Sequence, residues 1–358
     1  MNIHPNTHAS YSSRIAAVGS HLPSHEVSMD EVESQCENTT PIGLSNLTGI
    51  RTKRIASEDE DALALAEKAA RDCLAHAPFE ASDLEIVINC SISRMVNGLE
   101  LRFEPPLGVT IARRIGASSA IGFDVTNACA GMLTGLSLLD NLVRSGAVRR
   151  GMVVSGEHIS NIAKSACEDI TSWASEEVPS LTIGDAGAAV ILERCDPSEA
   201  GVLGSELVTL SQHADLCIGR PRTGKAGTSM FTKAKALHAA AIPAIAAPLR
   251  RLVDRLELRA EDLAWFVPHQ TSTRSIRSGI AQLRKEFDVP SNTRVAVTVD
   301  RYGNTASTTH FVALKRLLDH QALREGDLVL FLAYASGIVV GGVIIRVGGF
   351  VERYGHNY

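Results

Sequence analysis

Cys129 lies where a thiol could act as a nucleophile. The residues Ile121–Val125 predict a short buried strand, and the apolar spacing of Met132–Val143 predicts a helix that ends at Ser145–Gly146. A cysteine at such a strand–helix turn faces the positive end of the helix dipole and unpaired backbone N–H groups, which lower the pKa of a thiol. A buried structural cysteine is the alternative interpretation, because unpaired thiols are common core residues.

Three other short stretches place polar or glycine residues at predicted loops. His269 ends the apolar run Trp265–Pro268. Asn304 follows Gly303 at a turn that opens a helix, and Ser336–Gly337 connects two apolar strands. Taken singly, each has a structural explanation: a satisfied core histidine, an ordinary turn or helix cap, and a strand connection.

The elements that must position these residues alternate between apolar strands and helices. Predicted strands cover Arg14–Gly19, Leu84–Cys90 and Gly151–Ser155, and predicted helices cover Ala62–Leu74 and Val109–Ile115. Leu84–Cys90 is apolar almost throughout, as a strand buried in a parallel sheet would be. This alternation predicts right-handed βαβ units and a layered α/β architecture.

An internal sequence repeat divides the chain into two halves. Gly184–Glu193 resembles Ala335–Arg346: each is a small-residue turn that leads into an apolar strand, and each closes about half of the chain. A period this long indicates a duplicated domain. We therefore expect an N-terminal half over residues 1–205 and a C-terminal half over residues 206–358.

Two further segments carry specific expectations. Ser45–Arg54 is polar around Gly49 and predicts a loop. Ala234–Leu256 is rich in alanine and predicts a helix, which Pro243 and Pro248 should kink or split because proline lacks the N–H that continues a helix.

Composition excludes several classes of protein. The 358 residues carry a net charge of −5 without blocks of like charge, which argues against nucleic acid and an anionic membrane surface as partners. The 7 cysteines are widely spaced and form no C-x-x-C pair, which argues against a disulfide framework and against a zinc site. Met1–Ser13 lacks the apolar core of a signal peptide, and no apolar run approaches the ~18 residues that span a bilayer. We expect a soluble, cytoplasmic protein.

Together these stretches resemble one enzyme family. Asn127–Cys129, Pro268–Gln270 and Gly303–Thr305 occur in the order typical of β-ketoacyl-ACP synthase III-like condensing enzymes of the thiolase superfamily. Leu47–Arg51 and Gly184–Ala188 extend the resemblance over nearly the whole chain. The resemblance implies a thiolase-like five-layer αβαβα fold from two duplicated halves, and a homodimer. It also implies acyl carrier protein or acyl-CoA substrates and no metal, flavin or nicotinamide cofactor.

The resemblance also implies roles for the site residues. Cys129 accepts an acyl group as a thioester, which provides a good leaving group for carbon–carbon bond formation. The backbone N–H of Cys129, with one from Ser336–Gly337, forms the oxyanion hole for acyl transfer. His269 and Asn304 are neutral hydrogen-bond donors to the enolate oxygen of the second substrate.

Glu104 distinguishes a subgroup within this family. Phe103–Pro106 is similar to the Glu-Pro stretch of enzymes that join two acyl chains: head-to-head acyl-condensing thiolases, α-pyrone synthases and interconnecting ketosynthases. In that subgroup the glutamate reaches across the dimer into the partner's pocket and acts as a base, and burial in an apolar tunnel would raise its pKa to suit this role. Ala335–Gly337 also resembles this subgroup. A surface glutamate at a helix cap is the alternative interpretation of Glu104.

Other charged residues have two interpretations each. Two predicted helices carry basic residues that could meet the acidic surface of a carrier protein or the phosphates of CoA: Arg250, Arg251, Arg274 and Arg277. Solvated helix faces are the alternative. Glu157–His158 could be catalytic, but a supporting role is the preferred interpretation, and for His310 a packing role is preferred.

We expect a Claisen-type condensation of two acyl thioesters to a β-keto product, which can close to an α-pyrone. A malonyl acceptor would be decarboxylated with help from His269 and Asn304, whereas a β-ketoacyl or simple acyl acceptor would lose its α-proton to Glu104. We favour the second route. An acyltransferase that makes an ester or amide is a further alternative. A catalytically silent subunit is disfavoured because Cys129, His269 and Asn304 are all present.

Overall fold

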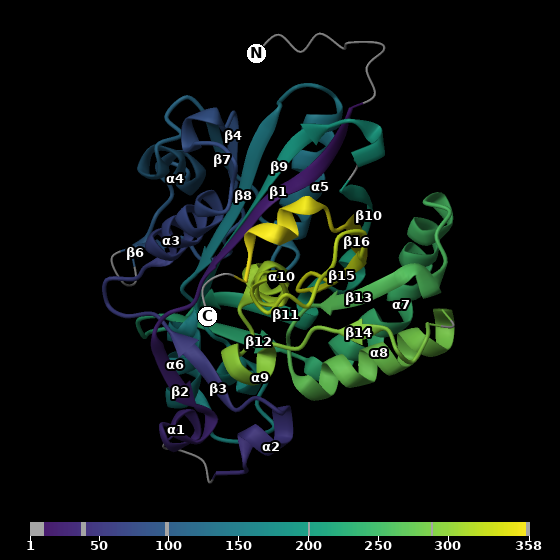
Figure 1. The fold of residues 1–358 in the computed structure, drawn as a ribbon. Helices are drawn as coiled ribbons and strands as arrows, with labels where there is room; N and C mark the ends of the chain where they lie inside the picture. The colour runs from purple at the N-terminus through teal and green to yellow at the C-terminus, as the bar shows by residue number, and fades with distance from the viewer. Residues whose placement is uncertain (1–10, 37–40, 97–99, 200, 288, 356–358) are drawn as a thin grey trace.

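The computed structural model is built around two five-stranded sheets (Figure 1). It describes residues 11–36, 41–96, 100–199, 201–287 and 289–355. Most of the polar N-terminal segment discussed above therefore lies outside the described residues.

The first sheet belongs to the N-terminal half. Its strands are, in spatial order, β1 (Ser12–His21), β9 (Ala186–Cys195), β8 (Arg150–Glu157), β4 (Ile86–Asn89) and β7 (Ile121–Asp124). β4 runs parallel to β7 and β8, and β9 runs antiparallel to β1 and β8. The strands predicted near residues 14, 84 and 151 are therefore confirmed as β1, β4 and β8.

The second sheet repeats this pattern. Its strands are β10 (Val202–Thr209), β16 (Val339–Arg346), β15 (Leu328–Ala335), β13 (Leu263–Pro268) and β14 (Arg294–Val295). β13 runs parallel to β14 and β15, and β16 runs antiparallel to β10 and β15. The repeat supports a duplication. A boundary between residues 205 and 206 would cut β10, so the strands favour a boundary between β9 and β10.

Helices form three layers around the two sheets. α3 (Ala62–Ala75) and α4 (Leu107–Ile115) cover the outer face of the first sheet. α7 (Ala234–Arg255) and α8 (Thr273–Phe287) cover the outer face of the second sheet. α5 (Gly131–Arg144) and α10 (Thr309–Asp319) lie between the sheets (Figure 1). The layers follow the αβαβα order expected of a thiolase-like fold.

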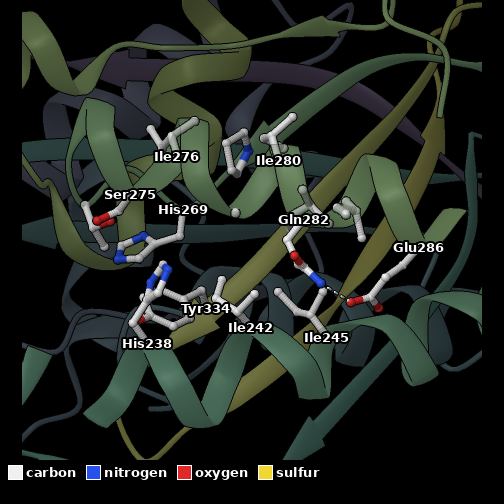
Figure 2. A pocket seen from close by; sticks show the side chains of 15 residues that line it. His238, Ile242, Ile245, His269, Ser275, Ile276, Ile280, Gln282, Glu286 and Tyr334 are labelled. Carbon is white, nitrogen blue, oxygen red and sulfur yellow. Dashed lines mark hydrogen bonds between the residues drawn. The ribbon is translucent and has the colours of Figure 1, made fainter. Parts of the chain in front are cut away.

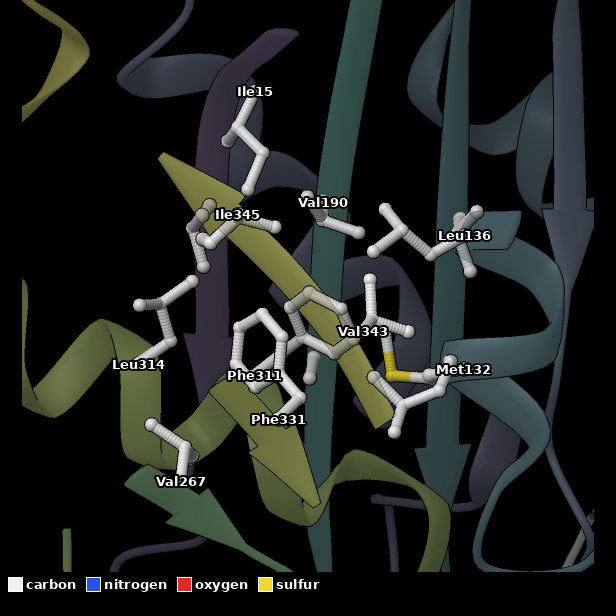
Figure 3. Close-up of a cluster of buried hydrophobic side chains, with 14 of the residues drawn as sticks. Ile15, Met132, Leu136, Val190, Val267, Phe311, Leu314, Phe331, Val343 and Ile345 are labelled. Atoms are coloured by element: carbon white, nitrogen blue, oxygen red, sulfur yellow. The ribbon is translucent and has the colours of Figure 1, made fainter. Parts of the chain in front are cut away.

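The central layer holds a large apolar cluster (Figure 3). Because side chains of a strand alternate between its two faces, Val329 and Phe331 of β15 point into this layer, whereas Leu330 and Leu332 pack beneath α7 and α8. Phe331 meets Phe311 of α10 with 5.5 Å between ring centroids. Each fully buried side chain of this size contributes roughly 1.5–3 kcal/mol, so the cluster holds the two sheets at a defined separation.

Smaller elements surround the sheets. The remaining strands are β2 (His25–Ser28), β3 (Thr52–Ile55), β5 (Met95–Val96), β6 (Glu100–Leu101), β11 (Cys217–Pro221) and β12 (Thr228–Thr232). The remaining helices are α1 (Met29–Ser34), α2 (Leu44–Thr48), α6 (Ser160–Asp169) and α9 (Val299–Tyr302). Short 3-10 helices cover Ala81–Asp83, Val178–Thr182, Pro197–Glu199, Ser211–Leu216, Ala260–Asp262, Ala306–Thr308 and Gly349–Arg353.

Ser45–Arg54 is not the loop that its polarity predicts, since most of it belongs to α2 and β3. Leu44 is fully buried at the start of α2 and anchors the helix, and Thr48 Oγ1 donates to Leu44 O at 2.8 Å. Gly49 ends the helix with φ 76°, a left-handed conformation that glycine adopts without steric cost. One buried leucine thus outweighs the local polarity.

α7 is one helix of 22 residues, so Pro243 and Pro248 do not split it. A proline inside a helix costs about 3 kcal/mol, and burial of Leu237, Ala241 and Leu249 against the second sheet offsets this cost. By its length and apolar composition α7 could cross a membrane, and it is the one such helix among the described residues. This is contrary to the expectation that no apolar run is long enough. Its apolar window is 33% buried in the fold.

β7 lies at the edge of its sheet, so it is not the fully buried strand that its sequence predicts. Ile121 is 47% exposed, and the other residues of β7 are half-buried. In the part of the chain that the structure describes, the outer edge of β7 pairs with no strand.

Candidate active site

Loops from both halves of the chain meet at one cavity of about 660 Å³. Cys129 lies between β7 and α5, and Ser336 lies between β15 and β16. His269 follows β13, and Asn304 follows α9. All four residues line the cavity. The fold therefore brings together three side chains that are far apart in the sequence: Cys129, His269 and Asn304.

Cys129 sits in a strained turn. The preceding residue, Ala128, has φ 45°, in the left-handed region that costs a non-glycine residue about 1–3 kcal/mol. Ala306 and Ile338, which follow two other loops of the cavity, share this conformation with φ 51° and 41°. Strained residues of this kind concentrate at functional sites, because the surrounding fold must supply the free energy that holds them.

The pKa of the Cys129 thiol is raised, not lowered. Burial raises the pKa of Cys129 to about 12, so the expected lowering by the helix dipole is wrong in net effect. The backbone N–H groups of Ser336 and of Cys129 itself act in the opposite direction as donors to the sulfur. An apolar cluster of Ile159, Ile183 and Ala306 packs against Cys129. This apolar environment raises the pKa more than the two N–H donors lower it.

The same two N–H groups are candidates for the oxyanion hole. Those of Cys129 and Ser336 lie beside the sulfur to which an acyl carbonyl would be attached. Gly337 does not line the cavity. Its φ of 74° instead allows the chain to turn from β15 to β16.

His269 is a buried, neutral imidazole. The residue is 5% exposed, and its backbone N–H donates to Leu332 O at 3.1 Å. Burial, with a smaller effect of the neighbouring His310, lowers the pKa of His269 to about 3. A neutral ring donates through one nitrogen and accepts through the other, and Nδ1 has no hydrogen-bond partner among the described residues. The neutral ring keeps one N–H, which can donate to an enolate oxygen.

Asn304 is held by the N-terminal half. Its backbone N–H donates to Thr182 O at 2.8 Å, and its carbonyl accepts from the N–H of Gly184 at 3.0 Å. Its side-chain Oδ1 accepts from the N–H of Ala306 at 3.0 Å, which leaves the amide nitrogen as the donor for the cavity. Gly303 has φ 68°, and a Cβ atom there would lie 2.6 Å from Thr182 O, so glycine is required before Asn304.

Glu104 lies on the surface of the chain and does not line the cavity. It does not cap α4 either, because the N-cap residue is Pro106. Exposed apolar side chains occur on β7, on α4 and on the segment between β4 and α4, and we refer to them together as the β7 patch: Ile92, Leu101, Phe103, Val109 and Ile121. A single chain therefore does not bring Glu104 to Cys129, and the expected role of Glu104 requires a second chain.

Of the four arginines predicted to bind a carrier or CoA, Arg274 lines the cavity. It is exposed near the start of α8 and donates to Asn46 O at 2.8 Å. Arg251 forms an ion pair of 3.0 Å with a glutamate of β10, and Arg250 donates to a backbone carbonyl of α8. Arg277 is exposed on α8. The geometry thus separates Arg274 from the other three.

The cavity also contains residues to which the sequence patterns assigned no role. Cys217 begins β11, Tyr334 lies on β15, and Lys235 and His238 lie on α7. The rings of His238 and His269 each lie 6.5 Å from the ring of Tyr334. The i, i+3 spacing of Lys235 and His238 on a predicted helix was an available signal, whereas Cys217 had none.

A buried network supports the cavity from the N-terminal half. Glu157 accepts hydrogen bonds from the N–H groups of Ile92 at 2.9 Å and Ser93 at 3.2 Å, and from the hydroxyl of Ser307. Burial raises the pKa of Glu157, and these donors partly oppose the effect. Neither Glu157 nor His310 lines the cavity.

Candidate cofactor ligands are few. Within the described ranges, no three His, Cys, Asp or Glu side chains are grouped as metal ligands would be. Lys235 and Arg274 are exposed cations at the cavity wall and could meet phosphate groups.

A smaller cavity of about 60 Å³ adjoins the first one between α7 and α8 (Figure 2). The two cavities share lining residues, including His238, His269 and Tyr334. Isoleucines of both helices face each other across it: Ile242, Ile245, Ile276 and Ile280. Its lining extends along α8 from Ser275 to Glu286, a length of about 16 Å at the helical rise of ~1.5 Å per residue.

Comparisons with known proteins agree over nearly the whole chain. The family model 3-oxoacyl-[acyl-carrier-protein (ACP)] synthase III matches residues 123–211, and the model of the C-terminal part of that enzyme matches residues 253–347. The β-ketoacyl-[acyl-carrier-protein] synthase III of Granulibacter bethesdensis is 28% identical over 337 residues, which cover 93% of this chain and 98% of the relative. The corresponding protein of Brucella canis is 27% identical over 338 residues, with the same coverage of 93% and 98%.

Solved structures give the same result. The priming β-ketosynthase of the R1128 polyketide pathway aligns with a TM-score of 0.82 and 25% identity over 96% of this chain and 99% of that one. OleA of Xanthomonas campestris, solved with lauric acid and lauroyl-CoA, aligns with a TM-score of 0.82 and 22% identity over 95% and 100%. At that identity the second likeness shows the fold.

Proposed function

We infer the function of this chain from its family, because it belongs to the β-ketoacyl-ACP synthase III-like condensing enzymes of the thiolase superfamily. It is a condensing acyltransferase that acts on acyl thioesters. We propose that Cys129 carries the acyl group and that His269 and Asn304 bind the enolate of the second substrate. The observation that carries this assignment is the meeting of these three side chains at one cavity.

The first half-reaction acylates Cys129. The sulfur attacks the carbonyl of an acyl thioester, and its proton moves to the neutral imidazole of His269. A C–S bond to Cys129 forms, and the bond to the pantetheine sulfur breaks; this sulfur leaves with the electron pair and takes the proton. Because burial disfavours both the free thiolate and the free imidazolium, we expect proton transfer to accompany the attack.

The second half-reaction forms the carbon–carbon bond. A base removes the α-proton of the second acyl thioester, and the enolate oxygen accepts hydrogen bonds from His269 and Asn304. The α-carbon then attacks the acyl carbonyl on Cys129. The C–S bond to Cys129 breaks, and its sulfur leaves with the electron pair and takes up the proton held by the base. The β-keto product stays attached to the second pantetheine sulfur.

We propose that the base is Glu104 of a second copy of the chain in a cytoplasmic homodimer. Among the described residues the outer edge of β7 is unpaired, and Phe103 of the β7 patch, which precedes Glu104 in the chain, is 75% exposed. Exposed strand edges and apolar patches of this kind favour association with another chain. Pairing of two β7 edges would cover the patch and carry each Glu104 toward the other chain.

We propose acyl substrates with extended alkyl chains. The smaller cavity adjoins the active site between two rows of isoleucines, and this apolar wall suits an alkyl chain. OleA, a structural relative, was solved with lauric acid and lauroyl-CoA. Lys235 and Arg274 at the cavity wall suit the phosphates of CoA or of a carrier-bound pantetheine arm.

A decarboxylating synthase is the second candidate, and one observation favours it. Glu104 lies outside the cavity of its own chain, and no carboxylate of the described residues lines that cavity. A malonyl acceptor needs no base, because loss of carbon dioxide generates the enolate directly. The β7 patch favours the first candidate, since it supplies a route by which Glu104 of another chain can arrive.

Product analysis by mass spectrometry tests the proposal. The purified protein is incubated with lauroyl-CoA alone and with lauroyl-CoA plus malonyl-CoA. A product of two lauroyl groups from lauroyl-CoA alone supports the non-decarboxylative route. A product that forms only with malonyl-CoA supports the second candidate, and an ester or amide formed with added alcohols or amines would contradict both. Cys129→Ala should abolish acylation of the protein.

A further inference from the structure

The active-site cavity contains a second thiol. Cys217 is half-buried and lines the same cavity as Cys129. The other cysteines of the chain are buried and do not line that cavity: Cys36, Cys73, Cys90, Cys167 and Cys195. Two nucleophilic groups of the same kind thus face one space, and the condensation described above uses one of them.

Ser336 contacts both sulfurs. Its hydroxyl donates to Cys217 Sγ at 3.1 Å, and its backbone N–H is a donor toward Cys129 Sγ. The hydroxyl of Thr232 lies 3.3 Å from Cys217 Sγ. A single residue therefore spans the gap between the two sulfurs. An acyl carbonyl attached to either sulfur lies close to the same serine.

The surroundings of Cys217 suit an alkyl chain. Cys217 packs against an apolar cluster formed by α7 and the β15–β16 connection, which includes Leu237, Ala241 and Ile338. Tyr334, between this cluster and His269, belongs to the lining of both cavities. A chain attached to Cys217 would therefore rest on apolar surface.

We propose that Cys217 is a second acyl acceptor, which takes an acyl group from Cys129 by thioester exchange and holds it in reserve while Cys129 is acylated again. This inference rests on the proposed function. The condensation takes its acyl group from Cys129, and we take the cavity wall that carries the exposed Lys235 and Arg274 as the mouth by which acyl thioesters enter. A chain held on Cys217 returns to Cys129 by the reverse exchange after a condensation, and so supplies the next one without entering by this mouth again.

The exchange balances without an added reactant. Cys217 Sγ loses its proton and attacks the carbonyl carbon of the thioester on Cys129. The new C–S bond forms to Cys217, the bond to Cys129 breaks, and Cys129 Sγ leaves with the electron pair and takes up a proton. One thioester and one thiol are present before and after the exchange. The acyl chain therefore favours whichever cysteine has the surroundings that bind it more tightly. The backbone N–H of Ser336 is the donor available to the tetrahedral oxyanion.

Intact-protein mass spectrometry tests this proposal. We use Asn304→Ala, which keeps both thiols but slows condensation, and incubate it with excess lauroyl-CoA. The expected mass gain is two lauroyl groups, which peptide mapping assigns to Cys129 and Cys217. Adding Cys217→Ala should limit the gain to one group. Adding Cys195→Ala, a matched change of a cysteine outside the cavity, should leave the gain at two.

The outcomes separate this inference from the proposed function. One lauroyl group on Cys129 and none on Cys217 would overturn the inference and leave the proposed function standing. No acyl group on either cysteine would overturn both. Adding Cys129→Ala should leave Cys217 unmodified, because the chain arrives through Cys129; equally fast labelling of Cys217 would overturn the exchange.

Discussion

Ser307, in the C-terminal half, donates a hydrogen bond to the carboxylate of Glu157, at the end of β8 in the N-terminal half. Ser307 lies three residues after Asn304, and Glu157 acts electrostatically on Cys129. This contact therefore joins the two halves next to both predicted catalytic residues. The position of Asn304 relative to Cys129 depends on such contacts and not on either half alone.

Glu157→Gln should lower the free energy of unfolding by about 1–3 kcal/mol. The two carboxylate oxygens accept hydrogen bonds from the N–H groups of Ile92 and Ser93, and an amide nitrogen in place of one oxygen would leave one N–H without an acceptor. Urea denaturation followed by circular dichroism measures the change. Glu325→Gln, at an exposed position, is the control and should leave stability unchanged. Equal stability of both variants would contradict the network.

Alkylation of Cys129 by iodoacetamide should accelerate about tenfold for each pH unit from neutral pH to about pH 10. Burial raises the pKa of Cys129 to about 12, so the thiolate is a minor species whose fraction grows with pH throughout this range. Mass spectrometry in a Cys217→Ala background gives the rate for Cys129 alone. A plateau near neutral pH would show instead that the helix dipole outweighs burial.

Asn304→Ala should reduce condensation by about 10²–10³-fold, because the enolate oxygen loses one of its two donors. Acylation of Cys129 should continue at nearly the wild-type rate, since that step does not use the amide. Product formation and intact mass are measured on the same sample. Asn141→Ala, on an exposed turn of α5, serves as the control. Parallel loss of both steps would indicate a structural role for Asn304.

Ile121→Glu should convert a dimer to a monomer, because it places a charge in the β7 patch at the sheet edge. Size-exclusion chromatography with light scattering reports the mass. Val297→Glu is the matched control, since Val297 is also an exposed apolar residue (40%) but lies in the second half of the chain. A dimer that survives Ile121→Glu would place the interface elsewhere.

Mixing Cys129→Ala with Glu104→Gln should restore activity that neither variant has alone. In a mixed dimer, the intact Cys129 of one chain would meet the intact Glu104 of the other. Random exchange of subunits at equal amounts would then return about a quarter of the wild-type rate, because half of the dimers are mixed and each has one complete site. Product formation after subunit exchange measures this. No recovery, with mixed dimers verified, would contradict a base supplied by the second chain.

Gly279→Leu should shorten the acyl chains that the enzyme accepts. A Cβ atom at Gly279 would already lie 3.4 Å from Ile242 Cδ1, so a leucine side chain would fill the space between α7 and α8. The ratio kcat/KM should fall for lauroyl-CoA and stay unchanged for butyryl-CoA. Gly219→Leu is the control, because a Cβ atom at Gly219 would meet no other atom within 4 Å. Gly326→Leu is unsuitable, because the positive φ of Gly326 would strain a leucine. An equal loss for both substrates would indicate a general disturbance of α8.

Much of the fold could be predicted from periodicity. Contacts repeat every two residues along a strand and every three to four along a helix, and this spacing is visible in a sequence. It predicted the strands β1, β4 and β8 and the helices α3 and α5. The duplication was also visible, because β9 and β16 have similar sequences. The loop predicted at Ser45–Arg54 failed, because one buried residue, Leu44, decided that segment.

What the sequence determined by itself is the list of chemical groups and the order of the layers: a thiol, an imidazole and an amide on the turns of a duplicated α/β fold. The tertiary structure decided how those groups behave. Burial among Ile159, Ile183 and Ala306 reversed the expected effect of the helix dipole on the pKa of Cys129. The fold also added Cys217 to the cavity and left Glu104 on the surface. The physical reason is that periodicity is a property of near neighbours, whereas desolvation and cavity walls depend on residues that the chain brings together from far apart.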